Sequence, residues 1–514
     1  MNDGVRLADL LAGLSLISDH GLGLPPDDAV RSSLVATGLA RKLGLPDAEV
    51  AAVLYAALLE HIGCTGYAHE TYLVWSDDLA ANRAAQQTNF ADPKELLTSY
   101  LPSLLRAVDG WERAQVAARF FTSGPGFLKR FATASCEVAA ETARRLGLPA
   151  DVQLGLRQYS EWWNGKGAPQ GLKADDIVLP GRVVHVASVG AKFDVLGGPE
   201  LAVEAVRRRS GSIFDPAIAE TFIAHAAELL AAPNRGDPRQ LVLEAEPEPK
   251  RFISIARLRE VAAAFGDVAD LKTPFTHGHS AGVARLACAA GETLGFDDDA
   301  LARLEVAALL HDIGRVAISN AVWEKPGPLT TGEWEQVRLH PYHSERILSC
   351  TGALRPIAAL AGMHHERLDG SGYHRGCTAS QIPPLARVLA AADAMQAMTQ
   401  SRPHRDAMTV DEAAERLHDD ARAGRLDPDA VRAVVEAAGG SARRTSDLRP
   451  AGLSEREVEV LQLMAQGFSN REISGRLYIS PRTAEHHVQH IYAKIGASSR
   501  ASAALFAMEH GLLA

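Results

Sequence analysis

A set of seven histidines and aspartates in the middle third of the chain has side chains that suit divalent metal ions. Two of the positions directly follow apolar runs: His311-Asp312 follows Val306–Leu310, and Asp393 follows Val388–Ala392. An ionisable group in such a place is costly to bury unless it is paired or bound to a metal. Imidazoles and carboxylates together favour iron, manganese, nickel or zinc. The candidate ligands are His279, His311, Asp312, His340, His364, His365 and Asp393.

The chemistry expected of such a set is the hydrolysis of a phosphodiester. A carboxylate can bridge two ions, and a pair of ions about 3.5–4 Å apart binds a phosphate, activates a bridging water and stabilises the leaving oxygen. Any one of these histidines alone is more often a structural or surface residue. The complete set in this order, with an Asp-Gly-Ser-Gly-Tyr loop between His365 and Asp393, is what indicates a site for two ions.

Residues 275–435 resemble the HD-GYP family of HD-superfamily phosphohydrolases. The matching stretches are His279-Ser280, His311-Asp312-Ile313-Gly314, Lys325-Pro326-Gly327-Pro328-Leu329-Thr330, His340-Pro341, the run from His364 to Tyr373, and Ala391-Ala392-Asp393-Ala394-Met395. The resemblance implies cyclic di-GMP as the substrate, opened to a linear dinucleotide or on to GMP. It also implies the division of the ligands: one metal is held by His279, His311, Asp312 and Asp393, and the other by His340, His364 and His365, with Asp312 shared.

The resemblance further implies which residues act on the substrate. Asp312 and Arg315 are the expected catalytic residues, and the Arg315 guanidinium can fork onto a phosphate. Arg402 lies in a loop that is similar to the family's loop after the last aspartate, and it either contacts the substrate phosphate or is a solvated loop arginine. The loop residues expected to bind the substrate are Asp369, Gly370, Ser371, Gly372 and Tyr373.

Three positions differ from the family pattern. Arg315 replaces a lysine, His374 replaces the proline of the Gly-Tyr-Pro motif, and Phe275 stands where some members have a glutamate that binds a third metal. Hydrolysis of cyclic di-GMP, or of a related cyclic mono- or dinucleotide, is the expected activity. The alternative is a nucleotide-sensing transcription factor whose HD site binds ligand and metal with little or no turnover. A different HD phosphohydrolase, such as a nucleotidase, is disfavoured by the 369–373 loop.

The C-terminal segment has the pattern of a helix-turn-helix. Ser454 and Glu457 form a capping box that opens a helix, and apolar residues follow at helical spacing. A second short helix follows, and Ser480-Pro481 opens a third, with serine as the cap and proline at the first helical position. The later helix of such a motif enters the major groove of DNA.

This segment resembles the LuxR/FixJ-type DNA-binding domain over nearly its whole length, including the stretch Ile491-Tyr492-Ala493-Lys494-Ile495-Gly496-Ala497. The usual basic residue is absent at Glu485, whose carboxylate can instead accept from cytosine N4. A three-helix protein-interaction module is the alternative. The resemblance places eight residues on double-stranded DNA, the last two at phosphates: Arg482, Thr483, Glu485, His486, His487, Gln489, Lys494 and Arg500.

The N-terminal part of the chain repeats the pattern of the middle third. Residues 164–171 match residues 369–376 with the glycines in step, and the match continues without a gap. The first copy is therefore expected to keep the fold and to lack the metal set, with a role in dimerisation, in sensing, or only in support of the second copy. The replacements are Glu60-His61 for His311-Asp312, Tyr159-Ser160 for His364-His365, and Ser188 for Asp393.

Length and composition predict an all-α protein of three domains. The 514 residues are rich in alanine and leucine, which favour helices, so we expect two tandem HD-type helical domains and a C-terminal helix-turn-helix. Residues 232–249 contain repeated prolines and acidic residues, which predict an extended connector, and residues 439–446 predict a flexible joint. The expected domains are residues 1–235, 250–438 and 450–514.

Charge and cysteine content limit the setting in which the protein acts. The net charge of -10 restricts any DNA contact to a local surface. Five cysteines without a C-x-x-C pair suit a reducing cytoplasm, and no apolar run reaches the length of a membrane span. We therefore expect a cytoplasmic protein that binds a cyclic nucleotide, double-stranded DNA, two divalent metal ions and a second copy of itself, and no membrane.

Overall fold

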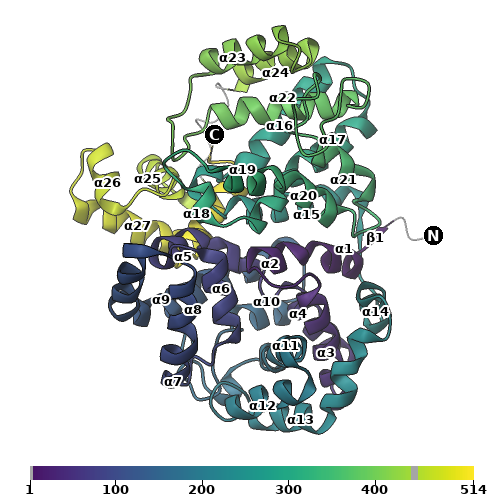
Figure 1. Ribbon diagram of the computed structural model, residues 1–514, viewed down its shortest axis with the longest axis vertical. Helices are drawn as coiled ribbons and strands as arrows, with labels where there is room; N and C mark the ends of the chain where they lie inside the picture. The colour runs from purple at the N-terminus through teal and green to yellow at the C-terminus, as the bar shows by residue number, and fades with distance from the viewer. Residues whose placement is uncertain (1–3, 442–449, 514) are drawn as a thin grey trace. The chain divides into compact units, whose positions relative to one another are not determined.

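The computed structural model describes residues 4–441 and 450–513, and nearly every regular element in these residues is a helix (Figure 1). The one sheet within them has two strands. The chain divides into two compact units, Met1–Ile255 and Ala256–Ala514, which we call unit 1 and unit 2. The expected all-α class is confirmed.

Unit 1 consists of packed helices, and the strands at its two ends pair with each other. Strands β1 (Gly4–Arg6) and β2 (Phe252–Ser254) are antiparallel, with Val5 opposite Ile253. This pairing brings the two ends of unit 1 together. The α-helices of unit 1 are α1 (Leu7–Leu14), α2 (Leu16–Gly21), α3 (Asp28–Lys42), α4 (Asp47–Leu59), α5 (Ala68–Trp75), α6 (Asp78–Gln87), α7 (Pro93–Glu95), α8 (Leu101–Arg106), α9 (Gly110–Arg145), α10 (Ala150–Arg157), α11 (Leu179–Gly197), α12 (Pro199–Arg209), α13 (Pro216–Ala231) and α14 (Pro238–Ala245).

The central helix of the HD part of unit 2 is α16 (His279–Thr293), which contacts α17 (Asp298–Leu310), α22 (Pro384–Met398) and α24 (Pro428–Ser441). Its inward residues include alanines such as Ala287 and Ala290, which are fully buried and allow the neighbouring helices to approach closely. The other elements of this part are α15 (Ile255–Asp270), η5 (Pro274–Thr276), η6 (Ile313–Ala317), α18 (Asn320–Trp323), α19 (Thr331–Arg338), α20 (His340–Leu348), α21 (Arg355–Gly362) and α23 (Val410–Arg422).

Four short helices at the end of unit 2 form the expected helix-turn-helix: α25 (Glu455–Ala465), α26 (Asn470–Arg476), α27 (Pro481–Ile495) and α28 (Arg500–Glu509). Ser454 and Glu457 form the predicted capping box of α25, and Ser469 caps α26 in the same way. Ser480 caps α27, and Pro481 is its first residue. The predicted starts of α25, α26 and α27 are therefore confirmed.

Residues 232–249 are not the extended connector that their prolines suggested. The short helix η4 (Ala232–Asn234) follows α13, and α14 then contacts α3. Pro238 is the first residue of α14, where a backbone N–H is not needed, and the Asp237 side chain caps the same helix. The expectation was wrong because proline starts a helix as readily as it interrupts one. The predicted joint at 439–446 begins within α24, and residues 442–446 lie outside the described residues.

The two HD-like parts contain the same local structures at corresponding positions. In each part a glutamate accepts hydrogen bonds from backbone N–H groups of the loop that follows it, and an arginine–aspartate pair joins two helices. These shared details support the interpretation that the chain contains a duplication. The corresponding features are Glu161 and Glu366, the ion pairs Arg182–Asp215 and Arg387–Asp427, and the backbone bridges Asn164–Lys173 and Asp369–Thr378.

One stretch of the described residues, Asp47–Trp75, has the length and apolarity of a membrane-spanning helix. Its most apolar window is 83% buried inside the protein, and the stretch is broken into α4, the short helix η1 (Ile62–Tyr67) and α5. These features are those of core helices, which meet the same length and composition criteria as a membrane span.

Candidate metal centre

All seven predicted ligands come together at one point in unit 2. Each is held at the end of a helix or within one, so that separate elements converge on the centre. All except the partly exposed His365 are buried. Their places are the first residue of α16 for His279, the turn after α17 for His311 and Asp312, the first residue of α20 for His340, the turn after α21 for His364 and His365, and the middle of α22 for Asp393.

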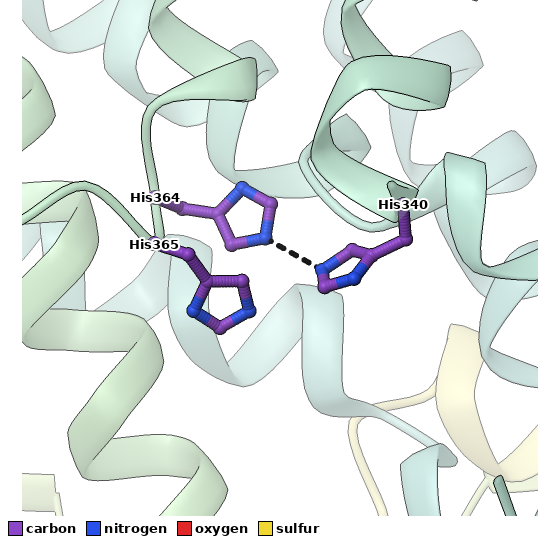
Figure 2. Close-up of side chains that lie close together, drawn as sticks. All are labelled: His340, His364 and His365. Carbon is purple, nitrogen blue, oxygen red and sulfur yellow. Dashed lines mark hydrogen bonds between the residues drawn. The ribbon is translucent and has the colours of Figure 1, made fainter. Parts of the chain in front are cut away.

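The ligand atoms form two groups. In each group, three ligand atoms all lie within 4.8 Å of one another, a spacing that suits a shared metal ion. One group consists of His279, His311 and Asp312, and the other of His340, His364 and His365. Figure 2 shows the second group, in which the Nε2 atoms of His340 and His364 are 3.1 Å apart.

The Asp312 carboxylate lies between the two groups, with one oxygen toward each. Its Oδ2 is 3.6 Å from the Nε2 atoms of both His279 and His311. Its Oδ1 is 3.3 Å from His340 Nε2 and 3.5 Å from His364 Nε2. This is the geometry of a carboxylate that bridges two cation positions.

Asp393 joins the first group from the opposite helix. Its Oδ1 is 3.2 Å from His279 Nε2 and 3.7 Å from His311 Nε2. Its Oδ2 faces His365 Nδ1 at 3.8 Å. The division of ligands that the sequence predicted is consistent with these positions, and Asp393 also approaches the second group.

Backbone carbonyls fix the orientation of three of the imidazoles. His311, His340 and His364 each donate Nδ1–H to the carbonyl of the third residue before them, at 2.7, 2.6 and 2.7 Å. Because Nδ1 has the proton, the neutral ring presents a lone pair on Nε2 toward the centre. The chain thus sets these rings in the tautomer that binds a metal.

Gln400 orients a fourth imidazole, that of His279. The sequence did not predict this role for Gln400. Its Oε1 is 2.9 Å from His279 Nδ1, so it accepts the proton on that nitrogen. The residue lies just beyond the end of α22, and no spacing rule connects it to His279. A polar residue close after Asp393 is the one signal that could have suggested it.

The donor set fits a divalent metal. In the neutral tautomers, the lone pairs of His340 Nε2 and His364 Nε2 point at each other and at Asp312 Oδ1, an arrangement that is repulsive unless a cation lies between them. Two buried atoms of the centre, His311 Nε2 and Asp312 Oδ1, have no hydrogen-bond partner within the described residues. Buried polar atoms rarely remain unsatisfied, and imidazole nitrogen with carboxylate oxygen suits first-row transition metals.

The electrostatics of the centre favour the metal-binding protonation states at most positions. Burial raises the pKa of Asp312, but His311 and Arg315 hold it well below its usual range. Burial also lowers the pKa of His365 well below its usual range. His311 is the exception, because Asp312 and Asp393 outweigh the effect of burial and raise its pKa to about 9. A divalent ion would therefore displace a proton from His311.

Two arginines lie near the ligands. Arg315 Nη1 is 3.3 Å from Asp312 Oδ2, and its guanidinium stacks 3.8 Å from the ring centre of Trp323. Trp323 Nε1 in turn donates to the Arg315 carbonyl at 3.1 Å. Burial, and then the positive charge of Arg315, lower the pKa of Arg402 to about 10. The two guanidiniums place positive charge beside the carboxylates, as a phosphate site requires.

The 369–373 loop presents Tyr373 to the edge of the centre. The Tyr373 ring lies 4.7 Å from the His365 ring, centre to centre. The Glu366 carboxylate accepts the backbone N–H groups of Arg375 and Cys377, which fixes the far side of the loop. Gly372 packs against the backbone so closely that a Cβ atom there would lie 2.4 Å from Arg367 N. The loop therefore requires glycine at this position.

His374, at the place of the family's proline, is held by a side chain from α20. Glu345 Oε2 lies 3.8 Å from His374 Nε2, and the same carboxylate pairs with Arg375. The loop is thus anchored by charged groups where the family pattern has a rigid ring.

The predicted DNA-facing residues fall into two structural classes. On α27, Arg482, Thr483, Glu485, His486 and Gln489 are exposed, and His487 is partly exposed. Lys494 and Arg500 instead have partners within the domain. Lys494 Nζ is 2.6 Å from Glu457 Oε2, and Arg500 donates to Phe468 O and Asn470 Oδ1, both at 2.8 Å.

Two parts of the chain match known families. Residues 264–430 match the HD domain family, and residues 451–507 match the LuxR family of bacterial regulatory proteins. The chain therefore combines an HD domain with a C-terminal LuxR-type regulatory domain.

Relatives of the chain are named as cyclic-nucleotide phosphodiesterases. A 3'3'-cGAMP-specific phosphodiesterase 3 of Vibrio cholerae is 29% identical over 439 residues, which are 84% of this chain and 94% of that protein. A cyclic di-GMP phosphodiesterase of Pseudomonas aeruginosa is 36% identical over 192 residues, 37% of this chain and 43% of that protein. A crystal structure of a cyclic GMP-AMP-specific phosphodiesterase of V. cholerae has a TM-score of 0.57 at 26% identity, and covers 85% of this chain and 98% of that chain.

Proposed function

We propose that the chain is a transcription regulator with a metal-dependent phosphodiesterase site for a cyclic nucleotide. The observation that carries the proposal is the Asp312 carboxylate, whose two oxygens face two separate histidine groups. In enzymes that hydrolyse phosphodiesters with two metal ions, a bridging carboxylate of this kind can hold the pair of ions. The names of the relatives support the same class of substrate.

The proposed metal ligands divide into two sets, built on the two groups that the spacing of the ligand atoms defines. When bound, two ions of iron, manganese, nickel or zinc would polarise the phosphodiester and make a bound water nucleophilic at neutral pH. The ion shared by His279, His311, Asp312 and Asp393 would lie beside the one held by His340, His364, His365 and Asp312.

The arginines act on the phosphate. Arg315, fixed by its stacking on Trp323, is placed to donate to a phosphate oxygen beside Asp312. Arg402 adds a second positive charge to the same region. Preorganised donors of this kind stabilise the negative charge that develops on the phosphate oxygens as the P–O bond breaks.

The substrate we propose is a cyclic dinucleotide that contains guanine, with cyclic di-GMP as the first candidate and 3'3'-cGAMP as the second. Tyr373 presents an aromatic ring beside His365, on which a base can stack. The polar loop around it offers further donors and acceptors, among them the Asp369 carboxylate and the Ser371 hydroxyl. The substrate-binding set is Asp369, Gly370, Ser371, Gly372, Tyr373 and Arg402.

The test is turnover of cyclic di-GMP, 3'3'-cGAMP and cyclic AMP by the full chain loaded with manganese or iron. We expect hydrolysis of at least one cyclic dinucleotide, no measurable hydrolysis by Asp312→Ala, and unchanged activity of His418→Ala, which removes an exposed histidine of the same domain. Tight binding of nucleotide without turnover by fully metal-loaded protein would overturn the enzyme assignment. It would establish the sensor in its place.

The C-terminal domain is proposed to bind double-stranded DNA through α27. The exposed polar residues of its first turns support this role, with Arg482 and Gln489 as the main candidates for base contacts. Gln489→Ala should weaken binding to a sequence selected from random DNA by about tenfold or more. Gln466→Ala, an exposed glutamine at the end of α25, is the matched control and should have no effect.

We propose that the protein acts in the cytoplasm as a homodimer with three functional domains, residues 1–235, 250–438 and 450–514. Free thiols at all five cysteines support a reducing compartment. The use of two half-sites by helix-turn-helix domains supports a dimer. Light scattering of the purified full chain should give twice the mass of the monomer, and the mass of the monomer would contradict the proposal.

A further inference from the structure

In unit 1 a buried lysine lies where the corresponding helix of unit 2 has an alanine. Ser188 of α11 corresponds to the ligand Asp393 of α22, and Lys192, one turn later, corresponds to Ala397. The Lys192 side chain is 6% exposed, and its Nζ donates to Ser188 Oγ at 2.6 Å. The amine is therefore directed back along the helix toward the position of the missing ligand.

The residues around this amine occupy the other ligand positions. Asp28 begins α3 as His279 begins α16. In both units an aspartate accepts the backbone N–H groups at this helix start: Asp19 in unit 1 and Asp270 in unit 2. Glu60-His61 holds the place of His311-Asp312, as the sequence comparison indicated.

Lys192 Nζ is at the centre of these groups. It is 2.7 Å from His61 Nε2, and 3.9 Å from both Asp28 Oδ2 and Glu60 Oε1. Tyr159, at the position of His364, closes the remaining side with its hydroxyl 3.3 Å from Ser188 Oγ. Within the described part of unit 1, no group of three metal-binding side chains meets the criterion that both groups in unit 2 meet.

The charges explain why a cation is needed there. Asp19, Asp28 and Glu60 are all buried in this region, and buried carboxyl groups require a cation, a proton or hydrogen-bond donors. His61 accepts from the lysine as a neutral ring, since burial and then Lys192 lower its pKa well below the usual range.

We propose that the Nζ of Lys192 takes the place of a metal ion in the first repeat, so that unit 1 contains its own fixed cation and binds no divalent metal at this centre. The amine is covalently attached to the chain, so this cation cannot dissociate from the site as a metal ion can. It also offers no coordination position for water or phosphate. Unit 1 thus keeps the packing of a metal-filled HD domain without a dependence on metal supply. The comparison with a filled centre in unit 2 rests on the proposed function.

The reciprocal substitution in unit 2 tests the equivalence of the two positions. Ala397→Lys should place an amine in the metal centre of the HD domain and lower the metal content of the purified full chain by about tenfold or more. Ala397→Met, which adds similar bulk without charge, is the matched control and should keep the metal. Wild-type metal content in a folded Ala397→Lys protein would overturn the proposal.

Hydrogen exchange of the full chain, read by mass spectrometry, tests the metal independence of unit 1. Treatment with EDTA should speed exchange in peptides from α16, α17 and α22, and should leave α3, α4 and α11 unchanged. Faster exchange of α11 after EDTA treatment of the wild type would overturn the proposal. A lack of EDTA effect in unit 2 would instead count against the proposed function alone, so the two failures are distinguishable.

Removal of the cation tests its role directly. Lys192→Met should speed exchange in α3 and α11 on the order of a hundredfold, because the loss of one partner leaves buried charge uncompensated. Lys192→Met/Glu60→Gln should recover part of the protection, and Lys166→Met, at an exposed lysine of the same unit, should have no effect. Unchanged exchange in Lys192→Met would also overturn the proposal.

Discussion

We expect single residues outside the proposed ligand set to affect how well the centre binds a metal. Gln400 holds His279 through Nδ1, and residues that orient a metal ligand commonly change metal affinity by about 10- to 100-fold. We therefore expect Gln400→Leu to weaken manganese binding by that amount, measured by competition with a chelator. Gln336→Leu, at an exposed site on α19, is the control. Equal affinity in the two variants would show that Gln400 does not position His279.

The buried acids of unit 1 predict a dependence of its stability on pH. Burial raises the pKa of Glu60 to about 7, although Lys192 opposes the shift. A carboxyl group with a raised pKa contributes stability that is complete below its unfolded value, about 4.3, and that is lost as pH rises through 7. The Glu60 carboxyl group should therefore contribute less to the stability of unit 1 at pH 8 than at pH 5.

Glu60→Gln tests this dependence because the amide does not titrate. We expect the stability of the wild type relative to the variant to be greater at pH 5 than at pH 8, because Asp19, Asp28 and the buried histidines His61 and His185 titrate in both proteins. Thermal unfolding followed by tryptophan fluorescence at several pH values is the measurement. A variant with the full wild-type dependence would contradict the assignment.

At the scale of residues, the sequence predicts the groups that chemistry constrains and misses those that only folding brings near. The order of His311-Asp312 and Asp393 after apolar runs predicts a ligand set, and the structure brings these side chains together. Gln400 and Lys192 act through space on residues far away in the chain, so no local pattern reveals them. Lys494 and Arg500 were expected to serve DNA phosphates, and their packing partners are also visible only in the structure.

At the scale of elements, the 369–373 loop is fixed by close backbone packing. A Cβ atom on Gly372 would lie 2.4 Å from Arg367 N and 2.5 Å from Glu366 Cα. Gly372→Ala should therefore displace Tyr373 and lower kcat/KM on the order of a hundredfold, with metal content unchanged. Gly327→Ala is the control, since nothing lies within 4 Å of its Cβ position. Equal kcat/KM in the two variants would exclude the loop from the reaction.

Helix starts were the most predictable elements. Serine caps and a proline at the first position identified α25 and α27 because the capping interactions are local in the sequence. The stretch around Pro238 was misinterpreted because the same residue type suits an extended linker and a first helical turn. Contact with α3, which the sequence does not show, favours the helix.

At the scale of the whole molecule, the two proposed activities lie in one chain and invite a test of their coupling. A nucleotide controls DNA binding only if it binds the DNA-competent and incompetent states unequally. We expect saturating amounts of a hydrolysis-resistant cyclic dinucleotide to change the affinity for DNA by about fivefold or more, measured by fluorescence anisotropy. Unchanged affinity would mean that the two activities are independent.

The pairing of β1 with β2 has a consequence for how such a protein can arise. Because Val5 lies opposite Ile253, the backbone enters and leaves unit 1 at neighbouring points. A segment with adjoining ends can be inserted into a gene, or deleted from it, without rerouting the polypeptide on either side. Recombination can therefore exchange unit 1 as a whole domain. We expect related chains without unit 1 to retain a functional HD domain.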